Sequence, residues 1–148
     1  MPLKKKRIKT MKYYLAYGSN LNKEQMQMRC PGAVPIGTML LKGFELQFKG
    51  PLTIKKKNGG RVPIGIWQVN EEHERSLDRY EGFPKFYYKK QVIIPGGKTS
   101  FIYIMNENMP ARTCSRSYYD ICAKGYEDFG FDVKYLNEAL KRSMEEFE

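Results

Sequence analysis

Several residue types that mark common protein classes are scarce in this sequence of 148 residues. It has only three cysteines, and an odd, small number of thiols argues against a disulfide-bonded scaffold and favours a reducing compartment. It has a single histidine, His73, which excludes a zinc site built from several histidines. The charged neighbours of His73 predict a solvated helix face rather than a place in an active site. A phosphate-binding glycine-rich motif ending in lysine is also missing.

Long apolar segments are absent as well. Crossing a membrane takes a run of about eighteen apolar residues, and the sequence contains none. The basic N-terminus is not followed by the apolar segment of a signal peptide. We therefore expect a cytoplasmic protein without a membrane partner.

Positive charge, in contrast, is abundant, with 26 Lys and Arg against 16 Asp and Glu and a net charge of +10. Five of the basic residues lie in the first nine positions, which hold no acid, so the rest carries 10 − 5 = +5. We expect residues 1–11 to form a disordered basic tail or a non-native extension before a true start at Met11. Residues 2–7 also resemble a nuclear-localisation signal. The length suits one domain, which we place at residues 12–148.

Short strands dominate the expected secondary structure. They are predicted at 13–17, 34–41, 44–48, 52–54, 62–69, 87–94 and 101–105. Glycine-containing turns at 58–60 and 95–98 predict two β-hairpins. Pro63 should lie at a sheet edge or a bulge, because it cannot donate to a ladder.

Four helices complete the pattern. The first is expected after Asn22, with Gln25 completing a capping box, and should end before Pro31. The second is expected at 71–80, between the cap Asn70 and the stop Gly82. The last two are expected at 117–124, ending at Gly125, and after Asp132, where Leu136, Leu140 and Met144 recur on one face. The order predicts an α+β fold: a small mixed or antiparallel β-barrel with flanking helices.

Three segments could carry chemistry. The first is the run Tyr14-Leu15-Ala16-Tyr17-Gly18-Ser19-Asn20-Leu21, a strand that enters a turn before a helix. Gly18 allows the backbone to approach a ligand closely, and amides without helix partners can bind an anion or a carbonyl oxygen. Spacing alone favours an ordinary strand-to-helix turn.

The second segment is centred on Glu81, at the expected C-terminal end of its helix. The negative end of the helix dipole disfavours a carboxylate there, and burial among aromatic rings would raise its pKa toward neutrality. A carboxyl group tuned in this way can both accept and give a proton. The alternative is a solvated glutamate before a turn. The aromatic neighbours are Tyr80, Phe83, Phe86, Tyr87 and Tyr88.

The third segment contains Tyr118, close to a helix start, with Gly125 downstream. Its hydroxyl could reach a pocket, although a tyrosine in the core would give the same pattern.

Together these segments resemble the γ-glutamylcyclotransferase-like family. The run from Tyr14 to Leu21 is similar to the opening signature of the family. The segment Leu77-Asp78-x-x-Glu81-Gly82 is similar to the segment that carries the family's catalytic glutamate, and Tyr118 is similar to the tyrosine of its third motif. The similarity spans roughly residues 13–140. One departure lies just before Tyr118, where the family's frequent prolines are replaced by Cys114 and Arg116.

The resemblance implies a mixed barrel with flanking helices and an enzyme that cyclises a γ-glutamyl amide to 5-oxoproline. It implies that Glu81 is the catalytic acid and base and that no metal or cofactor takes part. The implied substrate-binding residues are Tyr14, Leu15, Ala16, Tyr17, Gly18, Ser19, Asn20 and Tyr118.

Other functions remain open at this stage. The leaving group could be an amino acid, the ε-amine of lysine or part of a pathway-specific metabolite. The chain could also be a non-catalytic γ-glutamyl-binding module, in which a buried Glu81 would be hard to explain. A basic RNA-binding barrel is a third reading, which the tyrosines and lysines permit, although residues 55–57 are interpreted as a charged hairpin arm and a basic enzyme needs no nucleic acid. Whether the protein is a monomer or a homodimer is left open.

Overall fold

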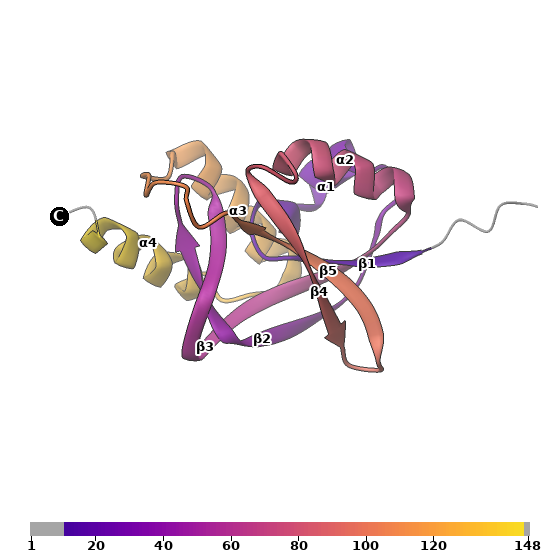
Figure 1. Ribbon diagram of the computed structural model, residues 1–148, viewed down its shortest axis with the longest axis horizontal. Helices are drawn as coiled ribbons and strands as arrows, with labels where there is room; N and C mark the ends of the chain where they lie inside the picture. Colours follow the sequence, from indigo (N-terminus) through magenta and orange to yellow (C-terminus); the bar gives the residue numbers. More distant parts are fainter. Residues whose placement is uncertain (1–10, 147–148) are drawn as a thin grey trace, which may run out of the picture.

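The computed structural model describes residues 11–146 and consists of one five-stranded sheet with helices packed along it (Figure 1). The predicted tail at 1–11 lies almost entirely outside this range. The elements in chain order are β1 (Lys12–Ala16), the short 3-10 helix η1 (Ser19–Leu21), α1 (Lys23–Arg29), β2 (Val34–Phe48), β3 (Leu52–Val69), α2 (Glu71–Glu81), β4 (Tyr87–Ile94), β5 (Lys98–Met105), α3 (Arg116–Phe129) and α4 (Lys134–Glu146).

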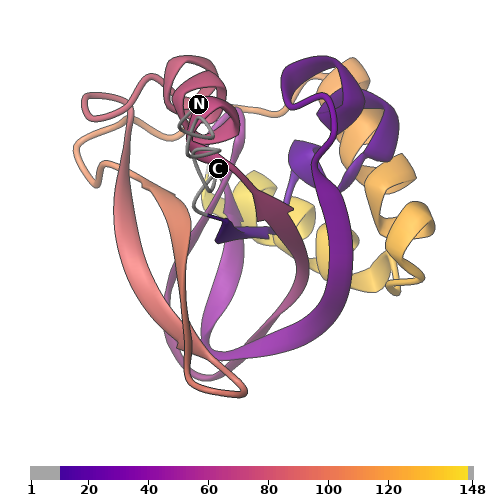
Figure 2. The same cartoon turned by 90° about the vertical axis from the view of Figure 1, so that its right-hand side faces the viewer.

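The sheet is mixed, with the strand order β2-β3-β1-β5-β4. β1 runs parallel to β5, and the other neighbouring pairs are antiparallel. The predicted α+β class with a mixed sheet is therefore confirmed. The ladder does not close into a barrel, because β2 and β4 remain its two edges, although the strands are long and strongly curved (Figure 2).

β2 and β3 form one long hairpin, which corrects the prediction for this region. The strands expected at 34–41 and 44–48 are a single strand, and so are those expected at 52–54 and 62–69. The hairpin turn expected at 58–60 is therefore wrong. The turn lies instead between Phe48 and Leu52, which pair with each other. Residues 57–60 form an extra segment of β3 opposite Gly43, and Gly43 and Gly59 both have positive φ. These glycines therefore permit a large bulge rather than a chain reversal.

α1 and α2 begin and end much as predicted. The Asn22 side chain accepts a hydrogen bond from the Gln25 amide, while the Gln25 side chain binds Arg29 instead of completing a capping box. Asn70 caps α2, and Gly82 ends it in the left-handed conformation with φ of 63°. The hairpin at 95–98 is also confirmed.

His73 does not lie on a solvated face, as the sequence suggested. It is buried, with 7% of its surface exposed. Its Nδ1 accepts from the Asn70 amide, so the ring proton lies on Nε2, which donates to the Pro31 carbonyl at 2.6 Å. His73 thus completes the capping box of α2 and ties that helix to the end of α1.

α3 is longer than expected, because it passes through Gly125 and ends at Gly130. A Cβ atom at Gly125 would lie 2.6 Å from the Asn22 amide nitrogen and 2.7 Å from Leu21 atoms. The glycine therefore allows α3 to pack directly on η1 and the start of α1, rather than stopping the helix.

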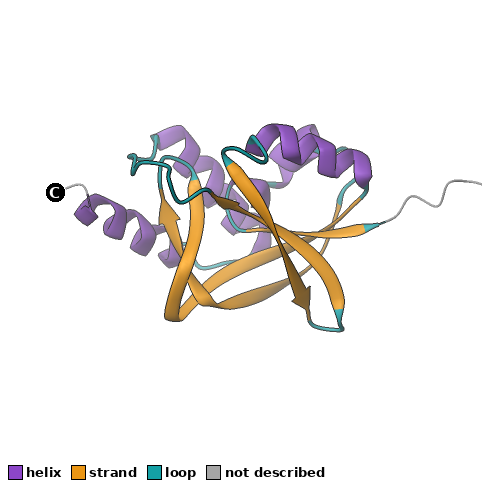
Figure 3. Cartoon of the chain, viewed as in Figure 1, coloured by secondary structure: helices purple, strands orange, loops and turns teal. Residues whose placement is uncertain are grey.

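α4 starts as predicted, since the Asp132 carboxylate accepts from the Lys134 amide. Its buried face contains Leu136, Ala139 and Ser143, whereas Met144 is 60% exposed, so the predicted apolar face is wrong at its end. Figure 3 shows the helices along the upper and left sides of the view, with the strands crossing beneath them. No helix within residues 11–146 is long and apolar enough to cross a membrane.

Candidate active site

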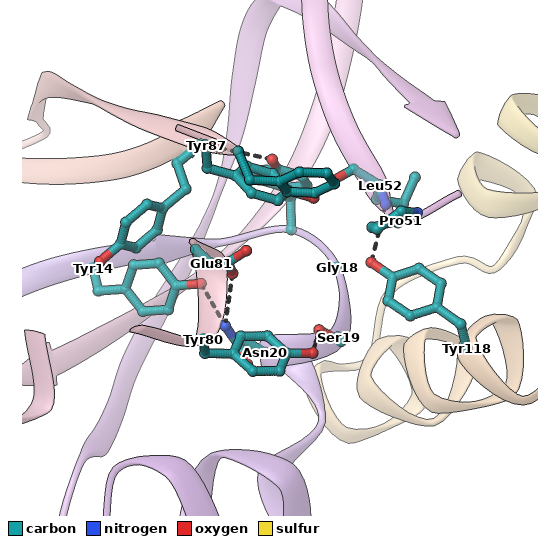
Figure 4. Close-up of a pocket in the computed structure, with 13 residues that line it drawn as sticks. Tyr14, Gly18, Ser19, Asn20, Pro51, Leu52, Tyr80, Glu81, Tyr87 and Tyr118 are labelled. Atoms are coloured by element: carbon teal, nitrogen blue, oxygen red, sulfur yellow. Dashed lines mark hydrogen bonds between the residues drawn. The ribbon is translucent and has the colours of Figure 1, made fainter. Parts of the chain in front are cut away.

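A cavity of about 230 Å³ opens where the turn after β1, the end of α2 and the start of α3 meet (Figure 4). These three segments carry the three motifs found in the sequence. The lining residues are Tyr14, Tyr17, Gly18, Ser19, Asn20, Pro51, Leu52, Tyr80, Glu81, Phe86, Tyr87, Tyr103 and Tyr118.

Most of the sequence-predicted site residues line this cavity, and two do not. Leu15 and Ala16 belong to the core, with 0% and 1% of their surfaces exposed. Since side chains alternate along a strand, Tyr14 faces the cavity while Leu15 points to the other face of the sheet. After β1 ends, the chain turns at Gly18 and presents Ser19 and Asn20 to the same cavity.

Glu81 is the last residue of α2, and its carboxyl group points into the cavity (Figure 4). Its Oε1 accepts a hydrogen bond from Asn20 Nδ2 at 3.3 Å, and the same Nδ2 donates to the Tyr14 hydroxyl at 2.9 Å. The residue is half-buried, but its carboxyl group is enclosed by protein atoms. This burial raises the pKa of Glu81 to about 7, and the positive charge of Arg29 opposes the rise.

The aromatic rings around Glu81 differ in part from those expected. Tyr80, Phe86 and Tyr87 line the cavity, whereas Phe83 and Tyr88 do not. The enclosure is completed by tyrosines from distant segments. Burial raises the pKa values of these phenols well above their ordinary value, so they stay protonated: Tyr14, Tyr17, Tyr87, Tyr103 and Tyr118. Glu81 is therefore the cavity group whose pKa has moved toward neutral pH.

Sequence reasoning missed Pro51, Leu52 and Tyr103. Leu52 is fixed by two cavity tyrosines: Tyr87 donates to its carbonyl at 2.7 Å, and Tyr118 accepts from its amide at 3.0 Å. No local pattern marks this contact, because it joins residues 35 and 66 positions apart. A correct prediction of the hairpin turn at 49–51 would have been the one indication that Leu52 lies beside a turn.

Gly18 brings backbone against the cavity, as the sequence suggested. A Cβ atom there would lie 3.3 Å from the Tyr118 hydroxyl and 3.5 Å from Leu52 atoms. None of the backbone hydrogen bonds found outside the helices and ladders of residues 11–146 uses the amide of Gly18 or Ser19. These two N–H groups are thus available to an oxygen atom of a ligand.

Comparison with known proteins agrees with this arrangement. The family described as gamma-glutamyl cyclotransferase, AIG2-like, matches residues 14–122, a segment that includes Tyr14, Glu81 and Tyr118. The chain belongs to this family. It is 30% identical over 145 residues to the gamma-glutamylcyclotransferase of Homo sapiens, a match that covers 86% of this chain and 76% of the human protein.

Two solved structures share the fold. One titled gamma-glutamyl cyclotransferase matches with a TM-score of 0.77 and 26% identity, over 88% of this chain and 86% of its own. A Bacillus subtilis protein matches with a TM-score of 0.70 at 21% identity, over 93% of this chain and 55% of its own, which indicates the fold alone. The family resemblance seen in the sequence motifs is therefore confirmed.

Proposed function

We propose that the protein is a gamma-glutamyl cyclotransferase, which converts a γ-glutamyl amide into 5-oxoproline and a free amine, with Glu81 as its general acid and base. Membership of the family supports the reaction. The observation that carries the site assignment is that the turn at Gly18–Asn20, Glu81 and Tyr118 line one cavity, although they come from three distant segments.

The first step is a proton transfer. The substrate's α-ammonium group must lose a proton before its nitrogen can act as a nucleophile. Glu81 is suited to accept it, because its pKa of about 7 leaves much of the carboxyl ionised at neutral pH yet basic enough to take a proton. An ordinary exposed glutamate, with a pKa of 4.5, would be a much weaker base.

Ring closure follows within one molecule. The freed amine attacks the substrate's own γ-carbonyl carbon, a new C–N bond forms, and the carbonyl oxygen becomes an oxyanion. Because the nucleophile and the electrophile belong to the same substrate molecule, the enzyme mainly has to fold the substrate into a reactive shape. In this proposal the oxyanion is received by the amides of Gly18 and Ser19, two cavity residues, and a donor of this kind contributes about 3–4 kcal/mol in comparable sites.

The last step expels the amine. The bond between the γ-carbon and the leaving nitrogen breaks as the oxyanion reverts to a carbonyl, and Glu81 returns its proton to that nitrogen. The ring nitrogen has been positively charged since the attack, and it gives its extra proton to the released amine, which becomes an ammonium ion. The carboxyl group is then ionised again, and 5-oxoproline and the amine leave the cavity. The sequence of steps consumes no oxidant, reductant or cofactor.

Neutral donors would hold the γ-glutamyl group. Glu81 is the only residue with a charged side chain among those that line the described cavity, so no cation there would bind the substrate's carboxylate. Backbone amides and hydroxyl groups can do so through charge-assisted hydrogen bonds. The proposed binding groups are those of Tyr14, Tyr17, Gly18, Ser19, Asn20 and Tyr118, while Leu15 and Ala16 would act through the backbone they fix.

The proposed setting is the cytoplasm, with a small γ-glutamyl compound as the substrate. Cys30, Cys114 and Cys122 are all free thiols, which suits a reducing compartment. The proposed reaction requires no nucleic acid and no membrane.

A release assay tests this function. The purified protein is incubated with a panel of γ-glutamyl amino acids, γ-glutamyl-ε-lysine and simple γ-glutamylamines, and 5-oxoproline is quantified. We expect release from at least one member, and the preferred leaving group identifies the substrate class. Tight binding of panel members without any 5-oxoproline would instead identify a binding module.

A further inference from the structure

Arg29, in the last turn of α1, is half-buried behind the cavity rather than in its wall. Its guanidinium group makes three directed contacts. Nη1 donates to Asn20 Oδ1 at 2.8 Å, Nη2 donates to Gln25 Oε1 at 2.7 Å, and the group lies 3.6 Å from the centre of the Tyr80 ring. Arg29 therefore joins α1 to η1 and to α2.

These contacts determine which way the Asn20 amide faces. A guanidinium group can only donate hydrogen bonds, so the atom of Asn20 that faces Arg29 must be the carbonyl oxygen Oδ1. The Nδ2 hydrogens must then point the opposite way, toward the Tyr14 hydroxyl at 2.9 Å and Glu81 Oε1 at 3.3 Å. Without Arg29, a flipped amide would present an oxygen to the carboxylate and repel it.

The donated hydrogen bond has a consequence for Glu81. It occupies Oε1, while Oε2 accepts no hydrogen bond from the described part of the chain. The carboxyl group is thus held at one oxygen and open at the other.

We propose that Arg29 is a positioning residue, which locks the Asn20 amide so that Glu81 is held through Oε1 and offers Oε2 to the substrate. This inference rests on the proposed function for its catalytic meaning, but its geometric part can be measured without turnover. Arg29 touches neither the cavity nor the reacting atoms, and it acts through Asn20.

The first test observes the amide directly. The side-chain NH₂ resonances of Asn20 are followed by NMR between pH 5 and 9, in the wild type and in Arg29→Met. In the wild type they should report the ionisation of Glu81, with a midpoint near the pKa of about 7. The other titratable side chains that line the cavity are tyrosines. Burial raises the pKa values of five of them well above the range of this titration: Tyr14, Tyr17, Tyr87, Tyr103 and Tyr118.

In Arg29→Met the amide should lose its fixed orientation. The pH-dependent shift of the Asn20 resonances should shrink, and its midpoint should move upward, because the nearby positive charge that favours the carboxylate is gone. Arg75→Met is the matched control: it removes one exposed guanidinium group from α2 and should leave both quantities unchanged. An unchanged titration in Arg29→Met would overturn the proposal.

The second test is a double-mutant cycle on turnover. Loss of a positioning hydrogen bond from a charged donor should lower kcat by about ten- to a hundredfold in Arg29→Met. In an Asn20→Ala background the same change should cost less than about threefold, since the group through which Arg29 acts is missing. Equal losses in both backgrounds would contradict action through Asn20.

Arg29→Lys guards against a simple folding defect. Lysine keeps the charge and can still donate to Asn20 Oδ1, but it cannot bind Gln25 at the same time with a planar fork. We expect it to restore most of the Asn20 titration and part of the turnover. If Arg29→Lys melts like the wild type yet behaves like Arg29→Met in both tests, the proposed lock does not exist. Absence of turnover in the wild type would count against the proposed function, and the NMR titration would still decide the role of Arg29.

Discussion

The hydroxyl oxygen of Tyr118, in α3, lies 3.0 Å from the amide nitrogen of Leu52, the first residue of β3. Tyr87 donates to the carbonyl of the same residue from β4. Leu52 is thereby held on both sides of its backbone, and the hairpin turn before it is fixed against the cavity. The outer wall of the site thus depends on two phenol groups that take no part in the proposed proton transfers.

Tyr118→Phe should weaken both the fold and substrate binding. The ring stays, but the Leu52 amide loses its acceptor, which costs about 1–3 kcal/mol when the donor is left unpaired. Urea unfolding should show this loss, and KM should rise more than kcat falls, because the wall rather than the acid and base is affected. Tyr13→Phe removes a hydroxyl that makes none of the side-chain hydrogen bonds found in residues 11–146 and should change neither quantity. Equal stability of the two variants would refute the role given to Tyr118.

Gly18→Ala should reduce catalysis without unfolding the protein. The new methyl group would lie 3.3 Å from the Tyr118 hydroxyl, at the cavity wall, where it takes space that the substrate needs. We expect kcat/KM to fall by about tenfold or more, since small displacements of the reacting atoms are costly. Gly37→Ala is the matched control, because a Cβ atom there meets nothing within 4 Å and the residue has no positive φ. Wild-type kcat/KM in Gly18→Ala would show that this turn does not contact the substrate.

The raised pKa of Glu81 should also appear in the pH dependence of stability. The group stays protonated in the folded state up to a pH of about 7, but ionises near its ordinary value of 4.5 when the chain unfolds. Its contribution is therefore fully present below pH 4.5 and is lost as the pH rises to about 7, a change on the order of 3 kcal/mol.

Glu81→Gln isolates that contribution, because an amide does not titrate. The free energy of unfolding, measured in urea, should fall between pH 5 and pH 8 more steeply in the wild type than in Glu81→Gln. Parallel curves for the two proteins would mean that the carboxyl group is not withdrawn from water.

Short sequence patterns correctly predicted helix caps and helix ends, which depend on neighbouring residues. Asn22, Asn70 and Asp132 cap their helices, and Gly82 ends α2, because capping depends on residues only two to four positions away. The same logic failed at Gly125. A glycine there looks like a helix end, but the reason for it is the backbone of Leu21 and Asn22, more than a hundred positions earlier.

The candidate site also has residues that local sequence patterns predict and contacts that they do not. Glu81 and the turn at Gly18 could be proposed from motifs, and their meeting at one cavity was an expectation of the family resemblance. The contacts of Leu52 with Tyr87 and Tyr118 could not be predicted, since they depend on how the long β2–β3 hairpin folds back. The glycines at 59 and 60 predicted a hairpin turn and instead belong to a bulge, because both structures use the same residue types.

The most direct test of the central assignment is the rate of 5-oxoproline release by Glu81→Gln, measured with the best substrate of the panel. Glutamine keeps the size of the side chain but cannot carry a proton between the two nitrogens. The account predicts a fall in kcat of about a hundredfold or more, with a melting temperature at pH 8 no lower than that of the wild type. Wild-type turnover by a folded Glu81→Gln protein would contradict it.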